Sequence, residues 1–438
     1  MIHTPRLVRA DVAVVGAGPA GLAAACRGAE AGARVVLLDE GLAAGGQIWR
    51  HAPGTPPPRD AQPWVDRLAR SGATTLFGTS VVDLRRDGAG APFVVSAERG
   101  PVACRVVAQQ VVVAAGARER LLPFPGWTLP GVIGVGGAQA LLKSGVSFAG
   151  KRVVVAGTGP LILPVAAALA AAGARLLLVA EQAPLGAVAG FAATLWRRPA
   201  LAAQAARYRL AFARTRYTTG SWVTAAEGDG RLERVVVRRA RGGTRALDCD
   251  VLCVGYGLVE NTELARLVGG ATDGGAVVVD DRQETSVQGL YCAGESTGVG
   301  GVDLSLVEGQ IAGLAAAGVT PAAALVRARA ELRALAGVLA RTFAPRAELR
   351  ALATPDTVVC RCEDVRCGAL DRAWSPRQAK LYTRAGMGPC QGRVCGPALE
   401  FLFGWPADAV RPPVKPILLS TLLADAAPDA APLDQGVA

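Results

Sequence analysis

Residues 12–21 have the sequence VAVVGAGPAG, an apolar run that ends in three spaced glycines. The run is typical of a buried strand, residues 22–30 are typical of a helix, and residues 35–38 of a second strand. The order of strand, glycine turn, helix and strand is that of a βαβ unit that binds a dinucleotide. We therefore expect an α/β fold built around a parallel sheet.

Each glycine of this stretch has its own physical role. Gly16 permits a tight turn, Gly18 lets the backbone approach a diphosphate, and Gly21 lets the helix pack closely on the strand. Asp39 follows the second strand 23 residues after Gly16, where a carboxylate can accept a hydrogen bond from a ribose. The helix N-terminus then faces the diphosphate with its partial positive charge. The predicted contacts of this first site are completed by Pro19, Ala20, Glu40, Gly46 and Gln47.

The composition excludes several classes of protein. Of the 438 residues, 51% are hydrophobic and 19% are charged, which excludes general disorder and allows about two to four domains. The net charge is +11, but no basic run has interleaved aromatics, so we expect no nucleic-acid partner. His3 and His51 are the only histidines, which argues against a His-rich metal site and a Ser-His-Asp triad. Neither a secretory signal nor a transmembrane segment is expected, so we predict a cytoplasmic protein.

A second glycine motif follows in the sequence VVVAGTGP, with Gly157 and Gly159 in the places of the first two glycines. Ile162 replaces the third glycine. By the spacing of the first motif the ribose acid should be residue 180, but this residue is Ala180, and Glu181 comes one place late. The pattern predicts a nucleotide-binding type of domain. Binding of NAD(P), binding of another adenine nucleotide and an empty site all remain open.

Two more strand-and-glycine segments, at residues 111–116 and 289–301, complete a resemblance to the glutathione-reductase-like flavoproteins, which have two dinucleotide-binding domains. The resemblance implies that the first motif binds the diphosphate of FAD. It also implies that the first of these segments marks the domain crossing and that the second contacts the flavin cofactor. The residues implied are Ala115, Gly116, Gly294, Glu295 and Gly301. Glu295 stands where the family has Asp, so the charge is kept on a longer side chain.

The ten cysteines are unevenly distributed. Five are scattered in apolar settings and are expected to be small buried side chains: Cys26, Cys104, Cys249, Cys253 and Cys292. No cysteine occurs at residues 45–50 or 131–147, so disulfide reduction by a cysteine pair is not expected. The other five lie within 36 residues, as Cys360, Cys362, Cys367, Cys390 and Cys395. Two converging pairs of thiolates can hold zinc or an iron–sulfur cluster, and the spacing alone leaves both open.

Residues 357–403 resemble the bacterioferritin-associated-ferredoxin-like domain, a small helical domain that binds a 2Fe-2S cluster. The motifs that carry this resemblance are CRCED, which starts at Cys360, and TRAGMGPCQGRVC, which ends at Cys395. The resemblance implies that the cluster ligands are Cys360, Cys362, Cys390 and Cys395. Cys367 has no place in the motif and is interpreted as a spare thiol. Structural zinc is the alternative.

With residues 46–50, 130–139 and 255–264 added, the whole chain resembles the α subunits of heteromeric amine and amino-acid dehydrogenases. These include opine oxidases, D-hydroxyproline dehydrogenase and hydrogen cyanide synthase. The resemblance implies an electron-relaying chain with no catalytic acid or base of its own. Its implied partners are an FAD-containing catalytic β subunit of the D-amino-acid-oxidase type, a downstream electron acceptor and a small ferredoxin-like subunit. Two alternatives remain: a stand-alone NAD(P)H-dependent ferredoxin-type or nitrite-type reductase, and a non-catalytic assembly subunit.

The predicted domains follow from these motifs. We expect an FAD domain at residues 1–118 and 270–345, an NAD(P)-binding-like domain at 119–269, a helical 2Fe-2S domain at 355–412 and a tail at 413–438. An Ala-rich helical insertion at 186–212 is either a cover over the sheet or a contact with another protein chain of the complex.

Overall fold

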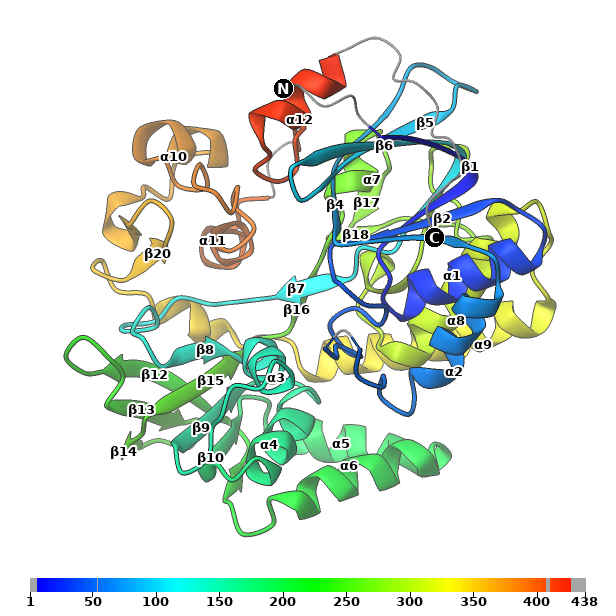
Figure 1. Cartoon of the computed structure of the whole chain (residues 1–438). Helices are drawn as coiled ribbons and strands as arrows, with labels where there is room; N and C mark the ends of the chain where they lie inside the picture. Colours follow the sequence, from blue (N-terminus) through cyan, green and yellow to red (C-terminus); the bar gives the residue numbers. More distant parts are fainter. Residues whose placement is uncertain (1–5, 53, 407–409, 427–438) are drawn as a thin grey trace. The chain divides into compact units, whose positions relative to one another are not determined.

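The computed structural model describes residues 6–52, 54–406 and 410–426. The chain divides into two compact units (Figure 1). Of the described residues, unit 1 contains 6–52, 54–118, 260–336 and 410–426, and unit 2 contains 119–259 and 337–406. The short strands β7 (Ala117–Glu119) and β16 (Leu258–Glu260) pair with each other where the chain passes between the units. The assignment of a ligand to each unit stays a prediction.

Unit 1 contains a seven-stranded sheet in the order β3-β2-β1-β6-β5-β4, with β19 also paired to β6. The strands are β1 (Arg6–Val15), β2 (Val35–Asp39), β3 (Thr74–Phe77), β4 (Thr79–Arg86), β5 (Phe93–Arg99), β6 (Val102–Val113) and β19 (Leu290–Cys292). Strands β1, β2, β3, β6 and β19 are parallel, whereas β4 and β5 join antiparallel. The predicted strands at residues 12–15 and 35–38 are thus confirmed as neighbours, paired from Val12 with Val35 onward.

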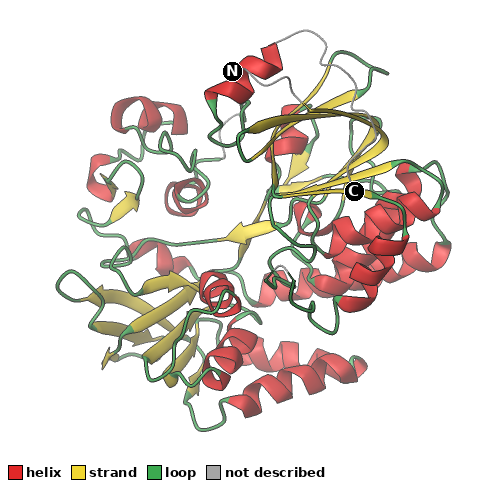
Figure 2. Ribbon diagram, viewed as in Figure 1, coloured by secondary structure: helices red, strands yellow, loops and turns green. Residues whose placement is uncertain are grey.

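Helices cover this sheet (Figure 2). They are α1 (Pro19–Glu30), α2 (Gln62–Arg70), α7 (Glu263–Leu267), α8 (Val302–Ala316) and α12 (Leu419–Ala426), with α9 (Ala323–Thr342) leading into unit 2. Helices α1 and α8 pack backbone to backbone through glycines. A Cβ on Gly309 would lie 2.1 Å from the Ala20 carbonyl oxygen, and one on Gly313 would lie 2.2 Å from that of Ala24. Both contacts advance by four residues, so the two helices run parallel.

Unit 2 contains a parallel five-stranded sheet in the order β11-β10-β9-β15-β8. Its strands are β8 (Val132–Gly134), β9 (Arg152–Gly157), β10 (Arg175–Glu181), β11 (Tyr217–Thr218) and β15 (Val251–Gly255). An antiparallel sheet follows, made of β12 (Ser221–Glu227), β13 (Arg234–Arg239) and β14 (Thr244–Asp248). The helices are α3 (Val135–Lys143), α4 (Ile162–Ala171), α5 (Leu185–Thr194) and α6 (Pro199–Ala211), the last two forming the predicted insertion. The predicted α/β class with two nucleotide-binding types of sheet is confirmed.

The segment that bears the clustered cysteines belongs to unit 2. It contains β20 (Val358–Cys360), β21 (Val365–Arg366), α10 (Pro376–Thr383) and α11 (Cys395–Phe403). Ser375 and Gln378 form a reciprocal capping box that starts α10. The Trp127 indole N–H donates to the Val358 carbonyl at 2.6 Å, which joins this segment to the rest of the unit.

The C-terminal residues 410–423 of unit 1 pack on its strands β4 and β5. The Val414 N–H donates to the Val82 carbonyl oxygen at 2.8 Å, and the Leu418 N–H donates to a Glu98 carboxylate oxygen at 2.7 Å. Lys415 forms an ion pair with Glu40. Residues 427–438 of the predicted tail lie outside the described residues. In the described part of the chain, no helix has both the length and the apolar character that crossing a membrane requires.

Candidate functional site

The first glycine loop connects β1 directly to α1. Gly16 has a φ of +100°, in the region that favours glycine. A Cβ on Gly21 would lie 1.6 Å from the Gly16 carbonyl oxygen, so only glycine lets the helix sit this close to the loop. At Gly18, by contrast, a Cβ would meet no atom of the described residues within 4 Å. This face of the loop is therefore open at the N-terminus of α1, where backbone N–H groups suit a diphosphate.

Helix α8 presents a second open N-terminus in the same unit. The N-cap residue of α8 is Gly301, with a φ of +84°, and no side chain of the described residues caps this helix end. A Cβ on Gly301 would also have no described atom within 4 Å. From the contact of Gly309 with Ala20, α8 begins about 9 Å before α1 along their common direction, at 1.5 Å per residue. An extended anionic cofactor can contact both helix ends.

Asp39 holds the first glycine loop in shape. One of its carboxylate oxygens accepts from the Ala17 N–H at 2.5 Å, and the other accepts from the Gly41 N–H at 2.6 Å. Burial raises the pKa of Asp39, and the two backbone donors oppose that rise. Gly46 closes on the loop from outside, because its Cβ would lie 2.9 Å from the Gly18 Cα. Asp39 and Gly46 thus both lie at the first glycine loop, while their contacts with a cofactor stay a prediction.

Two other predicted contacts point elsewhere in unit 1. Glu40 is more than half exposed and pairs with Lys415 of the C-terminal segment. The Gln47 side-chain oxygen accepts from the Arg50 guanidinium at 2.8 Å. Neither contact was evident from the sequence, because both depend on the paths of the surrounding segments.

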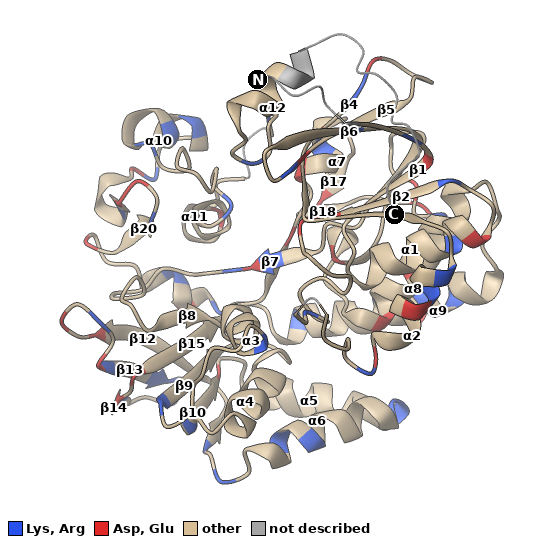
Figure 3. Ribbon diagram, viewed as in Figure 1, with Lys and Arg blue, Asp and Glu red and all other residues tan. Residues whose placement is uncertain are grey.

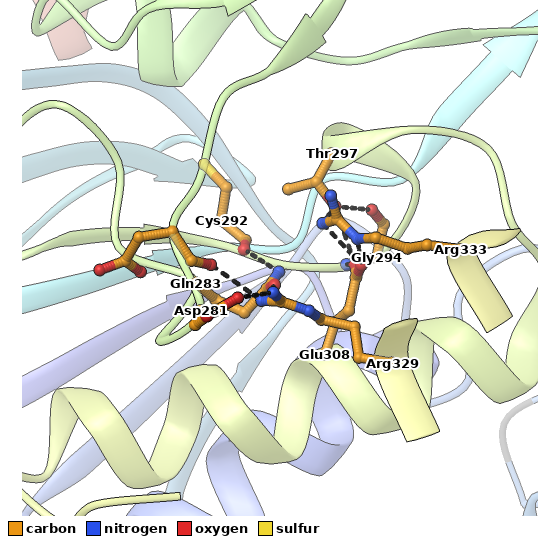
Figure 4. A network of polar contacts seen from close by, with 9 residues as sticks. Asp281, Gln283, Cys292, Gly294, Thr297, Glu308, Arg329 and Arg333 are labelled. Atoms are coloured by element: carbon orange, nitrogen blue, oxygen red, sulfur yellow. Dashed lines mark hydrogen bonds and ion pairs between the residues drawn. The ribbon is translucent and has the colours of Figure 1, made fainter. Parts of the chain in front are cut away.

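A buried acid that the sequence analysis missed supports the late glycine segment (Figure 4). Glu308 on α8 is 1% exposed, and one oxygen accepts from both the Gly294 N–H at 2.9 Å and the Thr297 hydroxyl at 2.8 Å. The other oxygen accepts from the Arg333 guanidinium at 2.8 Å. Burial raises the pKa of Glu308, and Arg333 opposes that rise. The available signal was an acid in the middle of a mostly apolar helix.

The same network continues through Arg329, which is nearly buried. It donates at 2.8 Å to both the Gln283 side chain and the Asp280 carbonyl, and it pairs with Asp281. Gln283 in turn donates to the Cys292 carbonyl at 2.8 Å, at the end of β19 (Figure 4). This network fixes the turn from β19 to α8, where Gly294 lies.

The structure also shows the contacts of residues 115–116, at the predicted domain crossing, and the environment of Glu295. The Asn261 side chain donates to the Ala115 carbonyl oxygen at 2.9 Å, and the Asn261 N–H donates to that of Gly116 at 3.0 Å. Glu295 is half-buried, and burial together with nearby Glu260 raises its pKa. Taken with the open loops at Gly18 and Gly301, this geometry fits FAD: glycine cradles lie where a phosphate would approach, and backbone donors face them.

The four predicted ligand cysteines lie as two hydrogen-bonded pairs in unit 2. The Cys395 thiol and the backbone N–H groups of Gly386, Glu363 and Cys362 donate to Cys360 and lower its pKa to about 6, although burial opposes this. The same hydrogen bond raises the pKa of Cys395. Cys362 and Cys390 form the second pair, and Cys362 also interacts with Cys360.

The loops around these thiols are tight. A Cβ on Gly388 would lie 2.2 Å from the Cys362 Cβ, and one on Gly386 would lie 3.9 Å from the Cys395 sulfur. Within the described residues, however, no three His, Cys, Asp or Glu side chains are grouped so that they could hold a metal ion. The donor chemistry suits an iron–sulfur cluster, whereas the cluster itself stays a prediction. Cys367 lies half-buried beside Arg372.

The five scattered cysteines are all buried, as predicted. Burial raises the pKa of Cys26 to about 11 and that of Cys249 to about 12. The thiols of Cys26 and Cys249 are therefore protonated at neutral pH, and they act as small packed side chains.

The second glycine loop differs from the first. Its helix, α4, begins at Ile162, three residues after Gly159, whereas α1 begins directly after Gly18. A Cβ on Gly157 would lie 1.8 Å from the Gly255 carbonyl oxygen, so this glycine is required by packing against β15. The Gly159 N–H donates to the buried Glu181 carboxylate at 2.8 Å. The acid that the first motif would place at residue 180 is thus Glu181.

Comparison with known proteins extends these observations. A family model described as pyridine nucleotide-disulphide oxidoreductase matches residues 10–317. The chain is 33% identical to an opine oxidase subunit of Rhizobium meliloti (strain 1021), over 93% of this chain and 97% of that protein. It is 33% identical to the HcnB subunit of hydrogen cyanide synthase of Pseudomonas aeruginosa, over 87% of this chain and 90% of that protein.

Among solved structures, L-proline dehydrogenase from P. horikoshii matches with a TM-score of 0.68 and 20% identity, over 96% of this chain and 80% of that chain. Thioredoxin reductase from T. acidophilum matches with a TM-score of 0.56 and 24% identity, over 71% of this chain and 98% of that chain. At these identities the likeness concerns the fold, and both neighbours share it.

Proposed function

The chain belongs to the pyridine nucleotide-disulphide oxidoreductase family and is an FAD-dependent oxidoreductase, and from this premise we propose that it relays electrons within a heteromeric dehydrogenase. The reaction proposed for the whole complex is oxidation of an amine, imino acid, D-amino acid or opine to an imine. We place the complex in the cytoplasm; any attachment to the inner membrane would be through partner subunits.

Unit 1 would hold FAD on the loop from Gly16 to Gly18 and on the start of α8 at Gly301. When bound there, FAD supplies a carrier that takes two electrons as a hydride and releases them singly. The chain's own residues bind and orient: Asp39 fixes the glycine turn through two backbone N–H groups, and Glu308 fixes Gly294. Asp39 and Glu308 therefore position the backbone of the proposed FAD site.

In unit 2, Cys360, Cys362, Cys390 and Cys395 would hold a 2Fe-2S cluster, which supplies a one-electron carrier. The pairing of Cys360 with Cys395 and of Cys362 with Cys390 supports this ligand set. Backbone N–H groups such as that of Gly386 already donate to sulfur, and in a loaded site such donors help to set the potential. Structural zinc would use the same thiolates, and metal analysis separates the two.

The observation that carries the proposal is similarity along nearly the whole length of chains named as subunits of oxidases and of hydrogen cyanide synthase. The family model ends at residue 317, but coverage of 93% of the chain cannot omit the cysteine-bearing segment. The aligned region therefore spans both segments that we predict to hold electron carriers. By that analogy the substrate would be dehydrogenated on an FAD-containing β subunit of the D-amino-acid-oxidase type. A downstream acceptor and a small ferredoxin-like subunit would complete the path.

The surface of α5 and α6 supports a contact with such a partner. Trp196, between the two helices, is 73% exposed, and Leu210 on α6 is 72% exposed. Basic residues also occur along α6 (Figure 3). Aromatic and Arg side chains next to exposed apolar ones are typical of protein interfaces. Removal of residues 186–212 should leave FAD bound and abolish assembly with the partner.

The test is an anaerobic flavin titration of the native complex and of the isolated chain. We expect an opine or imino acid to bleach the flavin absorbance of this chain only when the catalytic partner is present. Rapid bleaching of the isolated chain by NADH would instead support a stand-alone reductase. A flavin that bleaches under neither condition would support a non-catalytic role in assembly.

A further inference from the structure

In the second glycine loop, the helix does not begin directly after the loop, as it would have to in order to bind a diphosphate with its N-terminus. In the first loop, any side chain at Gly21 would lie 1.6 Å from the backbone of Gly16. The corresponding residue of the second loop is Ile162, which is 1% exposed and packed in the core of unit 2. The larger side chain cannot occupy the close position, and the helix accordingly begins three residues after Gly159. Its N-terminal N–H groups are displaced from the loop by one turn.

A buried acidic side chain accepts hydrogen bonds from the backbone N–H groups that a bound anion would need. Glu181 is fully buried, and its oxygens accept from the Gly159 N–H at 2.8 Å and from the Ala183 N–H at 2.7 Å. In the first loop the acid accepts one residue earlier in the motif, from Ala17 rather than from Gly18. The N–H of the middle glycine, which approaches the diphosphate in a dinucleotide site, is therefore already bonded to a carboxyl oxygen in the second loop.

The face that is open in the first loop is covered in the second loop by residues 343–346, which we call the strap. A Cβ on Gly159 would lie 3.8 Å from the Phe343 Cβ, whereas the equivalent position at Gly18 has no described atom within 4 Å. The Thr158 hydroxyl donates to the Phe343 carbonyl oxygen at 2.9 Å. The Phe343 ring also packs edge-on against Phe191 of α5, with ring centroids 5.6 Å apart.

Gln182 ties the rest of the strap to the loop. This fully buried side chain donates to the Thr158 hydroxyl at 2.8 Å and to the Ala344 carbonyl oxygen at 3.0 Å. Its oxygen accepts from the Arg346 N–H at 3.1 Å. The guanidinium of Arg346, the last residue of the strap, stacks 4.4 Å from the Trp222 ring centroid. Beyond the strap, the buried Leu349 joins the core of the unit.

We propose that the second glycine loop binds no dinucleotide and instead anchors the strap that leads to the four clustered cysteines. NAD(P) does not fit the residues present, because entry of its diphosphate requires displacement of Phe343 and separation of Glu181 from Gly159. The fold of a nucleotide-binding domain here holds the strap, the segment that connects α9 to the cysteine-bearing segment. The proposal is independent of the substrate of the complex and of the metal that the cysteines bind.

The first test is nucleotide binding to the FAD-loaded protein, measured by equilibrium dialysis with NADH, NADPH, ADP and ATP. We expect no saturable binding up to about 1 mM of each nucleotide, the range of the weakest specific sites. One nucleotide bound per chain with a Kd below about 100 μM would overturn the proposal. The bound FAD, measured in the same samples, reports that the protein is intact.

The second test measures hydrogen exchange of the FAD-loaded Phe343→Ala variant. We expect amides in residues 157–160 and 346–362 to exchange at least about tenfold faster than in the unaltered protein, because the strap and loop protect each other. Val146→Ala, an exposed apolar truncation elsewhere in unit 2, is the matched control and should change neither segment. Unchanged exchange at residues 157–160 would refute the anchoring. Thr158→Val, which removes only one strap hydrogen bond, gives the same readout if Phe343→Ala does not accumulate.

Discussion

Replacement of Glu181 by Gln should remove a pH dependence of folding that this buried carboxyl creates. Burial raises the pKa of Glu181 from 4.5 to about 7, against the lowering effect of the Ala183 and Gly159 N–H groups. Because the pKa of the folded state lies above that of the unfolded state, the folded protein binds the proton more tightly. The stabilisation by this proton is complete below pH 4.5 and is lost as the pH rises through 7.

The size of the effect follows from the two pKa values. A difference of about 2.5 pKa units at 1.36 kcal/mol per unit corresponds to about 3 kcal/mol of unfolding free energy, lost between pH 4.5 and pH 7. Glu181→Gln cannot ionise, so this part of the pH dependence disappears in the variant. Gln also has one oxygen where Glu offers two acceptors, so one backbone N–H loses its partner at every pH. The variant is thus destabilised by a constant amount, on the order of 1–3 kcal/mol.

Urea unfolding followed by far-UV circular dichroism at pH 5, 6, 7 and 8 measures the difference between variant and unaltered protein. The stability of the variant relative to the unaltered protein should improve by about 2.5 kcal/mol from pH 5 to pH 8, because part of the stabilisation is already lost at pH 5. Ser221→Ala, which removes a buried neutral hydroxyl from the same unit, should differ from the unaltered protein by the same amount at every pH. A parallel pH profile for Glu181→Gln would show that the carboxyl is not held in its buried contacts.

Three further predictions concern the packing and the two predicted cofactors. Gly309→Ala should destabilise unit 1 by about 1–3 kcal/mol in urea unfolding, because its Cβ would lie 2.1 Å from a carbonyl oxygen of α1. Gly190→Ala, where a Cβ has no described neighbour within 4 Å, should be neutral or stabilising by up to about 1 kcal/mol; equal losses would contradict the packing argument. Gly18→Val should yield protein without FAD, since its φ of −70° suits Val and only the cofactor's space is taken; normal flavin content would disprove that placement. Cys395→Ser should abolish iron–sulfur absorbance while Cys367→Ser keeps it, and zinc in anaerobically purified protein would rule out the cluster.

Local pattern was enough to predict the elements that build the first site. The strand at residues 12–15, the glycine turn and the following helix are confirmed because each depends on neighbours within a few residues. The meeting of Asp39 with Ala17 was also predictable, since strands β1 and β2 of a βαβ unit are adjacent and parallel. The five scattered cysteines were predicted to be buried because they lie in apolar runs.

The contacts between distant segments were not predictable in the same way. Glu308 has no motif around it, and its role depends on Arg333 and on the turn at Gly294. The ion pair of Lys415 with Glu40 joins residues 375 positions apart. Such partners depend on the path of the whole chain, which no local pattern encodes.

The sequence by itself determined that two glycine loops follow buried strands in an α/β chain with a separate cysteine cluster, because apolar periodicity and glycine spacing act locally. It left open whether the second loop takes a nucleotide. Only the tertiary structure addressed that point, by bringing Phe343 against Gly159 and its carbonyl within 2.9 Å of Thr158, 185 residues earlier in the chain. The physical reason is that a segment distant in the sequence packs against the second loop, whereas the corresponding face of the first loop has no described neighbour.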